Sequence, residues 1–75
     1  MQIEFSRHAK RRADLYRIPE ATIAEIIENK ELDEGKHEIV QDIETLKYPL
    51  KIVVVVKNDI ITVVSSYPLK KGRKT

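Results

Sequence analysis

The fold is decided by the stretch Ile52-Val53-Val54-Val55-Val56-Lys57-Asn58-Asp59-Ile60-Ile61-Thr62-Val63-Val64. It holds two apolar runs of strand length, rich in β-branched residues, on either side of a short polar segment. Asn and Asp tolerate the positive φ angles that tight hairpin turns need. The stretch therefore predicts a β-hairpin with its turn at Asn58-Asp59, whose strands lie at the centre of a sheet covered by helices on at least one face.

The N-terminal part of the chain predicts a short strand followed by two helices. Gln2 to Phe5 alternate polar and apolar residues, as an edge strand does. Ser6 suits the N-cap of a first helix, and a second helix follows Ile18, with Pro19 in its first turn. Each helix has an apolar side at helical spacing, formed by Phe5, Ala9, Ala13 and Tyr16 in the first and by Ile23, Ile26 and Ile27 in the second.

A further strand is expected at residues 36–43, after a turn at Gly35, and residues 48–50 form a connection. The pair Ile39-Val40 breaks the strict alternation there and indicates either a bulge or a strand register that the sequence does not fix. The sequence thus predicts an α+β domain of order β-α-α-β-β-β, with two helices packed on one face of a curved antiparallel sheet. The expected core includes Val54, Ile61 and Ile26.

The composition favours one small domain, residues 1–75, with residues 70–75 as a basic, flexible tail. Cysteine is absent, so neither a disulfide framework nor a thiolate metal site is possible. No apolar run has the length of a signal peptide or a membrane span. We therefore expect a cytoplasmic protein without a membrane partner.

The net charge of +2 is unevenly divided along the chain. Residues 1–19 carry five basic and two acidic side chains, residues 20–44 carry two and nine, and residues 45–75 carry seven and one. If the first helix lies beside the C-terminal strand, the two basic segments form one positive surface suited to a polyanion. The alternative interpretation is that these charges are solvated faces of small elements.

The segment Phe5-Ser6-Arg7-His8-Ala9-Lys10-Arg11-Arg12 indicates chemistry most directly. At a helical pitch His8 and Arg12 lie one turn apart on the same side. Histidine can move protons near neutral pH, and arginine holds phosphate oxygens in a planar fork. These residues together are suited to handling a phosphodiester.

Other chemistries lack their motifs. The chain has no Gly-rich phosphate loop, no His-x-x-x-His pair and no acidic cluster with calcium-loop spacing, so we expect no cofactor and no metal. His37 has no carboxylate at a recognisable ligand spacing. Ser65 and Ser66 have no nucleophile-elbow context and are interpreted as strand-end hydroxyls.

The segment from Phe5 to Arg12, the helix after Ile18 and the final Val63-Val64-Ser65-Ser66-Tyr67-Pro68 together resemble a small bacterial domain family of unknown function. Members of that family share a helical His-Ala-x-x-Arg head and a last strand that ends in Thr-x-Tyr-Pro or a similar string. The resemblance implies a relation to RelE-like toxins and to metal-independent ribonucleases of the RelE or barnase type, whose helices pack on a curved antiparallel sheet.

On this resemblance His8, Arg12 and Tyr67 match the family's polar positions. The chain departs from the family at Tyr16, where a second arginine is common, and at Ser65, where threonine is usual. The first departure removes one arginine of a two-arginine phosphate clamp, for which Arg11 or Arg17 could substitute.

Metal-free RNA cleavage needs a base near the 2′-hydroxyl, a cation on the phosphate and an acid at the leaving oxygen. His8 could serve as base or acid and Arg12 or Arg11 as the clamp. Tyr67 or a C-terminal lysine could be the second proton-transfer group or a stacking platform. Further phosphate contacts are expected from Arg7, Arg11, Ser65, Lys70 and Lys71.

Two other functions stay open. One is a non-catalytic module that binds RNA or a protein through the same basic surface, and the other is a scaffold whose acidic second helix pairs with another subunit. In these interpretations His8 bonds to the sheet edge, Arg12 pairs with Asp42 or Glu44, and Tyr67 fills the rim of the core. A toxin-type ribonuclease would have RNA as its substrate and an antitoxin-like protein as its partner.

Overall fold

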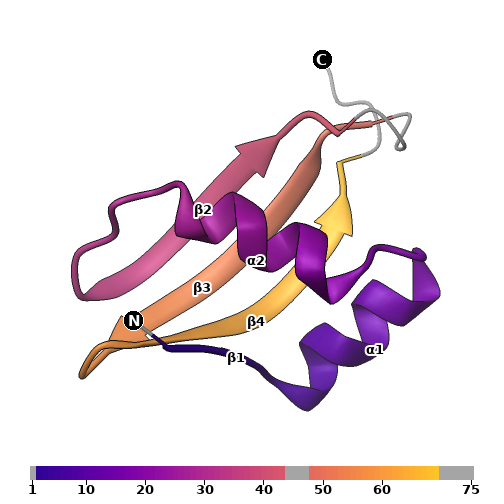
Figure 1. Ribbon diagram of the computed structural model, residues 1–75. Coiled ribbons are helices and arrows are strands. Elements are labelled where there is room, and N and C mark those ends of the chain that lie inside the picture. The colour runs from indigo at the N-terminus through magenta and orange to yellow at the C-terminus, as the bar shows by residue number, and fades with distance from the viewer. Residues whose placement is uncertain (1, 44–47, 70–75) are drawn as a thin grey trace.

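The computed structural model describes residues 2–43 and 48–69, which form two helices and a four-stranded sheet. The strands are arranged in the order β1-β4-β3-β2, so the hairpin strands β3 and β4 lie at the centre, as expected (Figure 1). The α+β class is confirmed. The elements along the chain are β1 (Gln2–Phe5), α1 (Arg7–Leu15), α2 (Glu20–Glu28), β2 (Gly35–Gln41), β3 (Leu50–Lys57) and β4 (Ile60–Pro68).

The hairpin turn has the expected conformation. Asn58 and Asp59 have φ angles of 54° and 64°, and positive φ at both central residues is the mark of the turn that matches the twist of a two-residue hairpin. The Asn58 N–H donates a hydrogen bond of 3.0 Å to the Glu34 carboxylate, just before β2. The turn is thereby attached to the chain that leads into the neighbouring strand.

The sheet is mixed, and the expectation of a wholly antiparallel sheet is wrong. β1 runs parallel to β4, from Gln2 opposite Ile60 to Phe5 opposite Val63. The pairs β2·β3 and β3·β4 are antiparallel. The reason is the connection: the chain leaves β1 through two helices and two strands before it forms β4, so no hairpin sets the direction of this pair.

The bulge expected at Ile39-Val40 is also wrong. β2 and β3 pair from Gly35 to Gln41 without a change of register. Both apolar residues fit a regular strand, because Ile39 is buried in the core and Val40 lies on the opposite face, 56% exposed.

The sheet's change of register lies in β4 instead. Val64 is an extra residue there, with no partner of its own on β3. Such a bulge exchanges the two faces for the rest of the strand. The paired positions on either side of it are Val54 with Val63 and Val53 with Ser65.

The bulge decides which residues of β4 enter the core. Val63, before the bulge, is fully buried, and after the bulge Ser66 is the buried residue. Tyr67 therefore lies on the opposite face, directly across from Lys51. Within the described residues the Ser66 hydroxyl has no hydrogen-bond partner, a burial that costs about 1–3 kcal/mol.

Ser6 attaches the first helix to this bulge. Its N–H donates to the Val63 carbonyl at 3.0 Å and its hydroxyl donates to the Val64 carbonyl at 3.1 Å. The same hydroxyl accepts from the Ala9 N–H at 3.0 Å, which confirms Ser6 as the N-cap of α1. α1 thus begins where β1 ends and continues beside β4.

Both helices bury the apolar sides that the sequence predicts. Ala9 and Ala13 of α1 are buried, and so are Ile23 and Ile27 of α2, which crosses one face of the sheet (Figure 1). Pro19 precedes α2 as its N-cap residue and is not in its first turn, a small correction. The N-cap position suits proline because the residue there need not donate an intrahelical hydrogen bond.

The opposite face of the sheet carries no helix (Figure 1), and we call it the open face. The alternation of burial along β3 and the strand pairing define its members. They are Gln2 and Glu4 of β1, Lys36, Glu38 and Val40 of β2, Lys51, Val53, Val55 and Lys57 of β3, and Ile60, Thr62, Ser65 and Tyr67 of β4, with the bulged Val64 beside them.

The core contains Val54 and Ile61, as predicted, with 0% and 4% exposure, and Ile26 packs against it half-buried. We expect Val54→Ala and Ile61→Ala each to lower the free energy of unfolding by about 1 to 4 kcal/mol, through lost burial and an incompletely collapsed cavity. Chemical denaturation measures the loss. Val40→Ala, the same truncation at an exposed position, should change it by less than about 0.5 kcal/mol; equal effects at all three sites would contradict this core.

Candidate functional site

The contact between α1 and the end of β4 brings together two of the predicted site residues. The Arg12 guanidinium lies over the Tyr67 ring, with its carbon 6.0 Å from the ring centroid. An arginine in this position is attracted by the electron-rich face of the ring. Arg12 reaches the ring because the bulge turns Tyr67 away from the core.

Lys51 extends this contact across the sheet. It is paired directly with Tyr67 in the β3·β4 register, and its ammonium lies 3.0 Å from a carboxylate oxygen of Glu38 on β2. Arg12, Tyr67, Lys51 and Glu38 thus form a line from α1 over three strands, and we call it the polar row.

The charges of the polar row stabilise one another. The hydrogen bond from Lys51, and then its charge, hold the pKa of the Glu38 carboxyl below the ordinary value of 4.5. The hydrogen bond to Glu38 raises the pKa of Lys51, with the Tyr67 phenol adding to it and desolvation opposing it. Lys51 therefore remains a cation beside the phenol.

Lys51 was missed by sequence reasoning. It precedes an apolar run and looks like an ordinary solvated lysine of a strand. Counted back from the Asn58-Asp59 turn in a regular hairpin, it would face Ser66, not Tyr67. Only the position of the bulge shows that lysine and tyrosine are neighbours.

His8 lies one turn before Arg12 on α1, so the two side chains project from the same flank of the helix. Its imidazole is exposed to solvent. Among residues 2–43 and 48–69, the His8 side chain takes part in no hydrogen bond or ion pair, and the expected bond to the sheet edge is not formed there.

The pairings and positions expected for the remaining site residues are only partly present. Arg12 makes no ion pair with Asp42 in the described part of the chain, and Glu44 lies outside it. Tyr67 is half-buried on the open face and does not fill the core. Ser65, also half-buried, lies on the same face opposite Val53, whereas Lys70 and Lys71 are outside the described residues.

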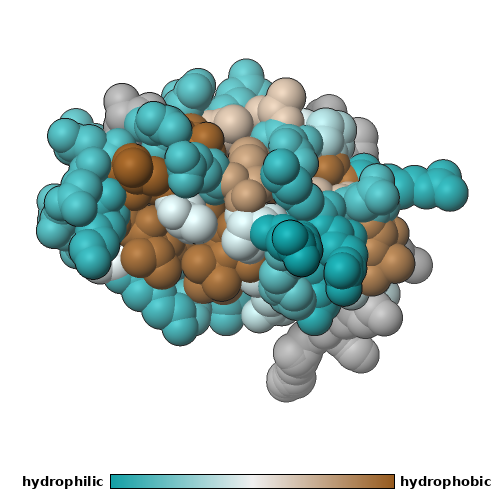
Figure 2. Space-filling model, turned by 90° about the horizontal axis from the view of Figure 1, so that it is seen from below, coloured by the Kyte–Doolittle hydropathy of each residue, from teal (hydrophilic) through white to brown (hydrophobic). Residues whose placement is uncertain are grey.

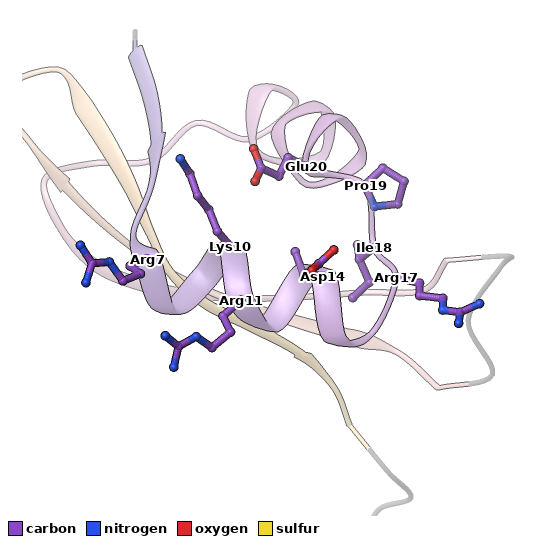
Figure 3. Close-up of a pocket in the computed structure, with 9 residues that line it drawn as sticks. Arg7, Lys10, Arg11, Asp14, Arg17, Ile18, Pro19 and Glu20 are labelled. Atoms are coloured by element: carbon purple, nitrogen blue, oxygen red, sulfur yellow. The ribbon is translucent and has the colours of Figure 1, made fainter.

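The outer flank of α1 carries a second group of cations. A wide groove of about 850 Å³ runs along it, and the helix junction forms one wall. Figure 3 shows Arg7, Arg11 and Arg17 pointing outward, whereas Lys10 and Glu20 point into the space between the helices. Arg7 and Arg11 thus lie on a different flank of α1 from Arg12, and the structure does not bring them to Tyr67.

Residues 2–43 and 48–69 contain neither a cluster of metal-binding side chains nor a helix that could span a membrane. No cluster of three or more histidine, aspartate or glutamate side chains is placed there to hold a metal ion. The His37 ring is hydrogen-bonded with the Asp33 carbonyl oxygen at 2.6 Å, before β2. Neither described helix has the length and apolar character needed to cross a membrane.

No family model, no curated protein and no solved structure matches the chain. The site is therefore interpreted from its own geometry, and the family resemblance stays a prediction.

The pairing of Lys51 with Glu38 gives a pH-dependent test. Because the pKa of Glu38 is lowered in the folded protein, the pair contributes to stability above pH 4.5 and is lost as the pH falls through the lowered pKa. A carbon-detected NMR titration should place the Glu38 midpoint below 4.5 in the wild type and close to that value in Lys51→Met. Lys57→Met, a matched change on the same strand, should leave it unchanged. Equal midpoints in the wild type and Lys51→Met would refute the pairing.

Proposed function

We propose that this protein acts on RNA as a small, metal-independent ribonuclease-like domain of the toxin type. The observation that carries the proposal is the Arg12 guanidinium over the Tyr67 ring. This contact joins α1, which is rich in cations, to the Tyr67 phenol at the end of β4 and to its neighbour Lys51 on β3. Metal-free phosphodiester cleavage needs a cation on the phosphate and two groups that exchange protons, and here these are a guanidinium, an imidazole and a phenol.

The residues have distinct roles in the proposed reaction. His8 accepts the proton of the 2′-hydroxyl, whose oxygen forms a bond to the adjacent phosphorus. The bond from phosphorus to the 5′-oxygen breaks, and that oxygen takes a proton from the Tyr67 phenol. The products are a 2′,3′-cyclic phosphate and a 5′-hydroxyl, so the substrate must be RNA and not DNA.

The cations supply the electrostatic part of catalysis. Negative charge accumulates on the non-bridging phosphate oxygens as the 2′-oxygen attacks, and Arg12 is placed to stabilise it through its planar fork. Lys51, held as a cation by Glu38, adds a second positive charge beside the phenol, where it can stabilise the developing charge on the phosphate. An RNA substrate also accords with a cytoplasmic location.

One observation favours a second candidate, an RNA-binding module without cleavage. His8 is exposed, and no described side chain fixes its ring for proton transfer. A general base is usually oriented by a hydrogen bond to another group. In the second candidate the polar row holds phosphate and stacks a base, and His8 is one more contact on the surface.

Single substitutions separate the two candidates. His8→Ala should lower cleavage of a fluorescent RNA by roughly two to four orders of magnitude and leave RNA affinity nearly unchanged, because proton transfer acts in the transition state. Arg12→Ala should weaken cleavage and binding, and should flatten the salt dependence of binding by about one unit. Tyr67→Phe keeps the aromatic ring but removes the hydroxyl, so it should lose cleavage and keep RNA binding.

Lys30→Ala is the control, since Lys30 is an exposed lysine that lies near Gln41 of β2, across the sheet from α1. Cleavage and binding should equal those of the wild type. If the wild type binds RNA without cutting it and Arg12→Ala reduces binding, the second candidate replaces the first. If the wild type neither cuts nor binds RNA, both are wrong.

A further inference from the structure

The open face carries more apolar residues than a solvent-exposed sheet face usually does. An antiparallel sheet with one solvated face normally alternates apolar and polar residues, whereas a strand covered on both faces has a continuous apolar run. β3 has the continuous run, Ile52 to Val56. Its outward residues Val53 and Val55 have no helix over them, and Val55 is 37% exposed. The sequence of β3 is thus that of a strand whose second face is covered.

The apolar residues of this face are contiguous. A shallow hollow of about 560 Å³ has Val55, Ile60 and Val64 as its apolar floor. Figure 2 shows an apolar patch toward the hairpin end of the molecule, next to the hydrophilic surface of α1. A contiguous apolar patch with a polar rim is typical of an interaction site.

Cations border the apolar floor. Lys36 on β2 is directly opposite Val55, and Lys57 is the next residue of β3 on the same face. Three carboxylates lie nearby: Glu4 lines the hollow, Glu38 binds Lys51, and Glu34 accepts a hydrogen bond from the Asn58 N–H. Lys36 and Lys57 take part in no ion pair among the described residues, so their positive charge is available to a partner.

We propose that the open face binds an acidic amphipathic helix of a partner protein. The apolar side of that helix covers Val53, Val55 and Val64, and its carboxylates lie against Lys36 and Lys57. A helix is the natural cover, because α2 already covers the other face in this way with Ile23 and Ile27. The partner completes a three-layer domain.

Charge and chemistry argue against the other occupants. A second copy of the chain would bring the same two lysines against this face, where they repel the lysines already present. RNA bases would find valines there, which offer neither aromatic stacking nor hydrogen bonds. Val53 is paired with Glu38 and with Ser65, so the docking surface borders the polar row, whereas Val55 lies nearer the hairpin turn. The docking surface does not depend on the proposed function, since it needs neither His8, Arg12 nor Tyr67.

The test uses two designed helical peptides with leucines on one side, one with glutamates and the other with lysines on the opposite side. The valine methyl groups of the wild-type protein are followed by NMR. The acidic peptide should shift Val53, Val55 and Val64, and the basic peptide should not. The double variant Lys36→Glu, Lys57→Glu should bind the acidic peptide about threefold to tenfold more weakly, since exposed ion pairs are modest.

Lys30→Glu, a charge reversal away from the open face, is the matched control and should bind like the wild type. Val55→Ser should weaken binding while its circular dichroism and unfolding midpoint show that it is folded. The proposal is overturned by a lack of binding, by equal binding of both peptides, or by a dimer in sedimentation that Val55→Ser dissociates. A shift of Val55, which lies away from the polar row, on adding RNA would overturn it too. RNA cleavage by the same samples reports separately on the proposed function.

Discussion

The attachment of Ser6 to the bulge in β4 is the constraint on which the rest of the structure depends. One hydroxyl caps α1 and donates to the Val64 carbonyl, while the Ser6 N–H bonds to the Val63 carbonyl. At this point the neighbour of β4 changes from a parallel strand to a helix. After the extra residue, the side chains of β4 point to the opposite faces from those in a regular strand. Tyr67 therefore lies on the open face, next to Arg12.

This arrangement has an energetic cost and a chemical result. In a regular register Tyr67 would be paired with Leu50 and its ring would enter the core, whereas the bulge buries the Ser66 hydroxyl without a partner in the described structure. A buried unpaired hydroxyl opposes folding. In return the domain presents a phenol and a lysine side by side next to a guanidinium. Such a local departure from the best core is expected at functional sites.

Much of the fold could be predicted because it depends on local signals. The Asn58-Asp59 turn, the Ser6 cap and the buried side of each helix follow from residue type and spacing alone. The parallel pairing of β1 could not be predicted, because it is decided by tertiary contacts at a sheet edge. The predicted bulge lies in the wrong strand, because in Val63-Val64 either valine can face the core equally well.

The site was predictable in part. Arg12 was selected by its helical spacing from His8 and Tyr67 by resemblance, and the structure places them in contact. Lys51 and Glu38 were missed, because their positions depend on the register after the bulge. Arg7 and Arg11 were grouped with Arg12 by charge, although helical geometry separates their flanks. The sequence shows which residues share one side of a helix. It does not show which residues share one face of a strand after a bulge whose position is unknown.

The orientation of the Tyr67 ring tests this account most directly. A three-dimensional NOE spectrum of the labelled protein should show contacts from the Tyr67 ring protons to the side chains of Arg12 and Lys51, together with contacts from Ser66 to the methyl groups of the core. Contacts from the Tyr67 ring to Leu50 and Ile52, with none to Arg12 or Lys51, would show that β4 keeps a regular register. In that case the bulge, the polar row and the proposed site would all be wrong.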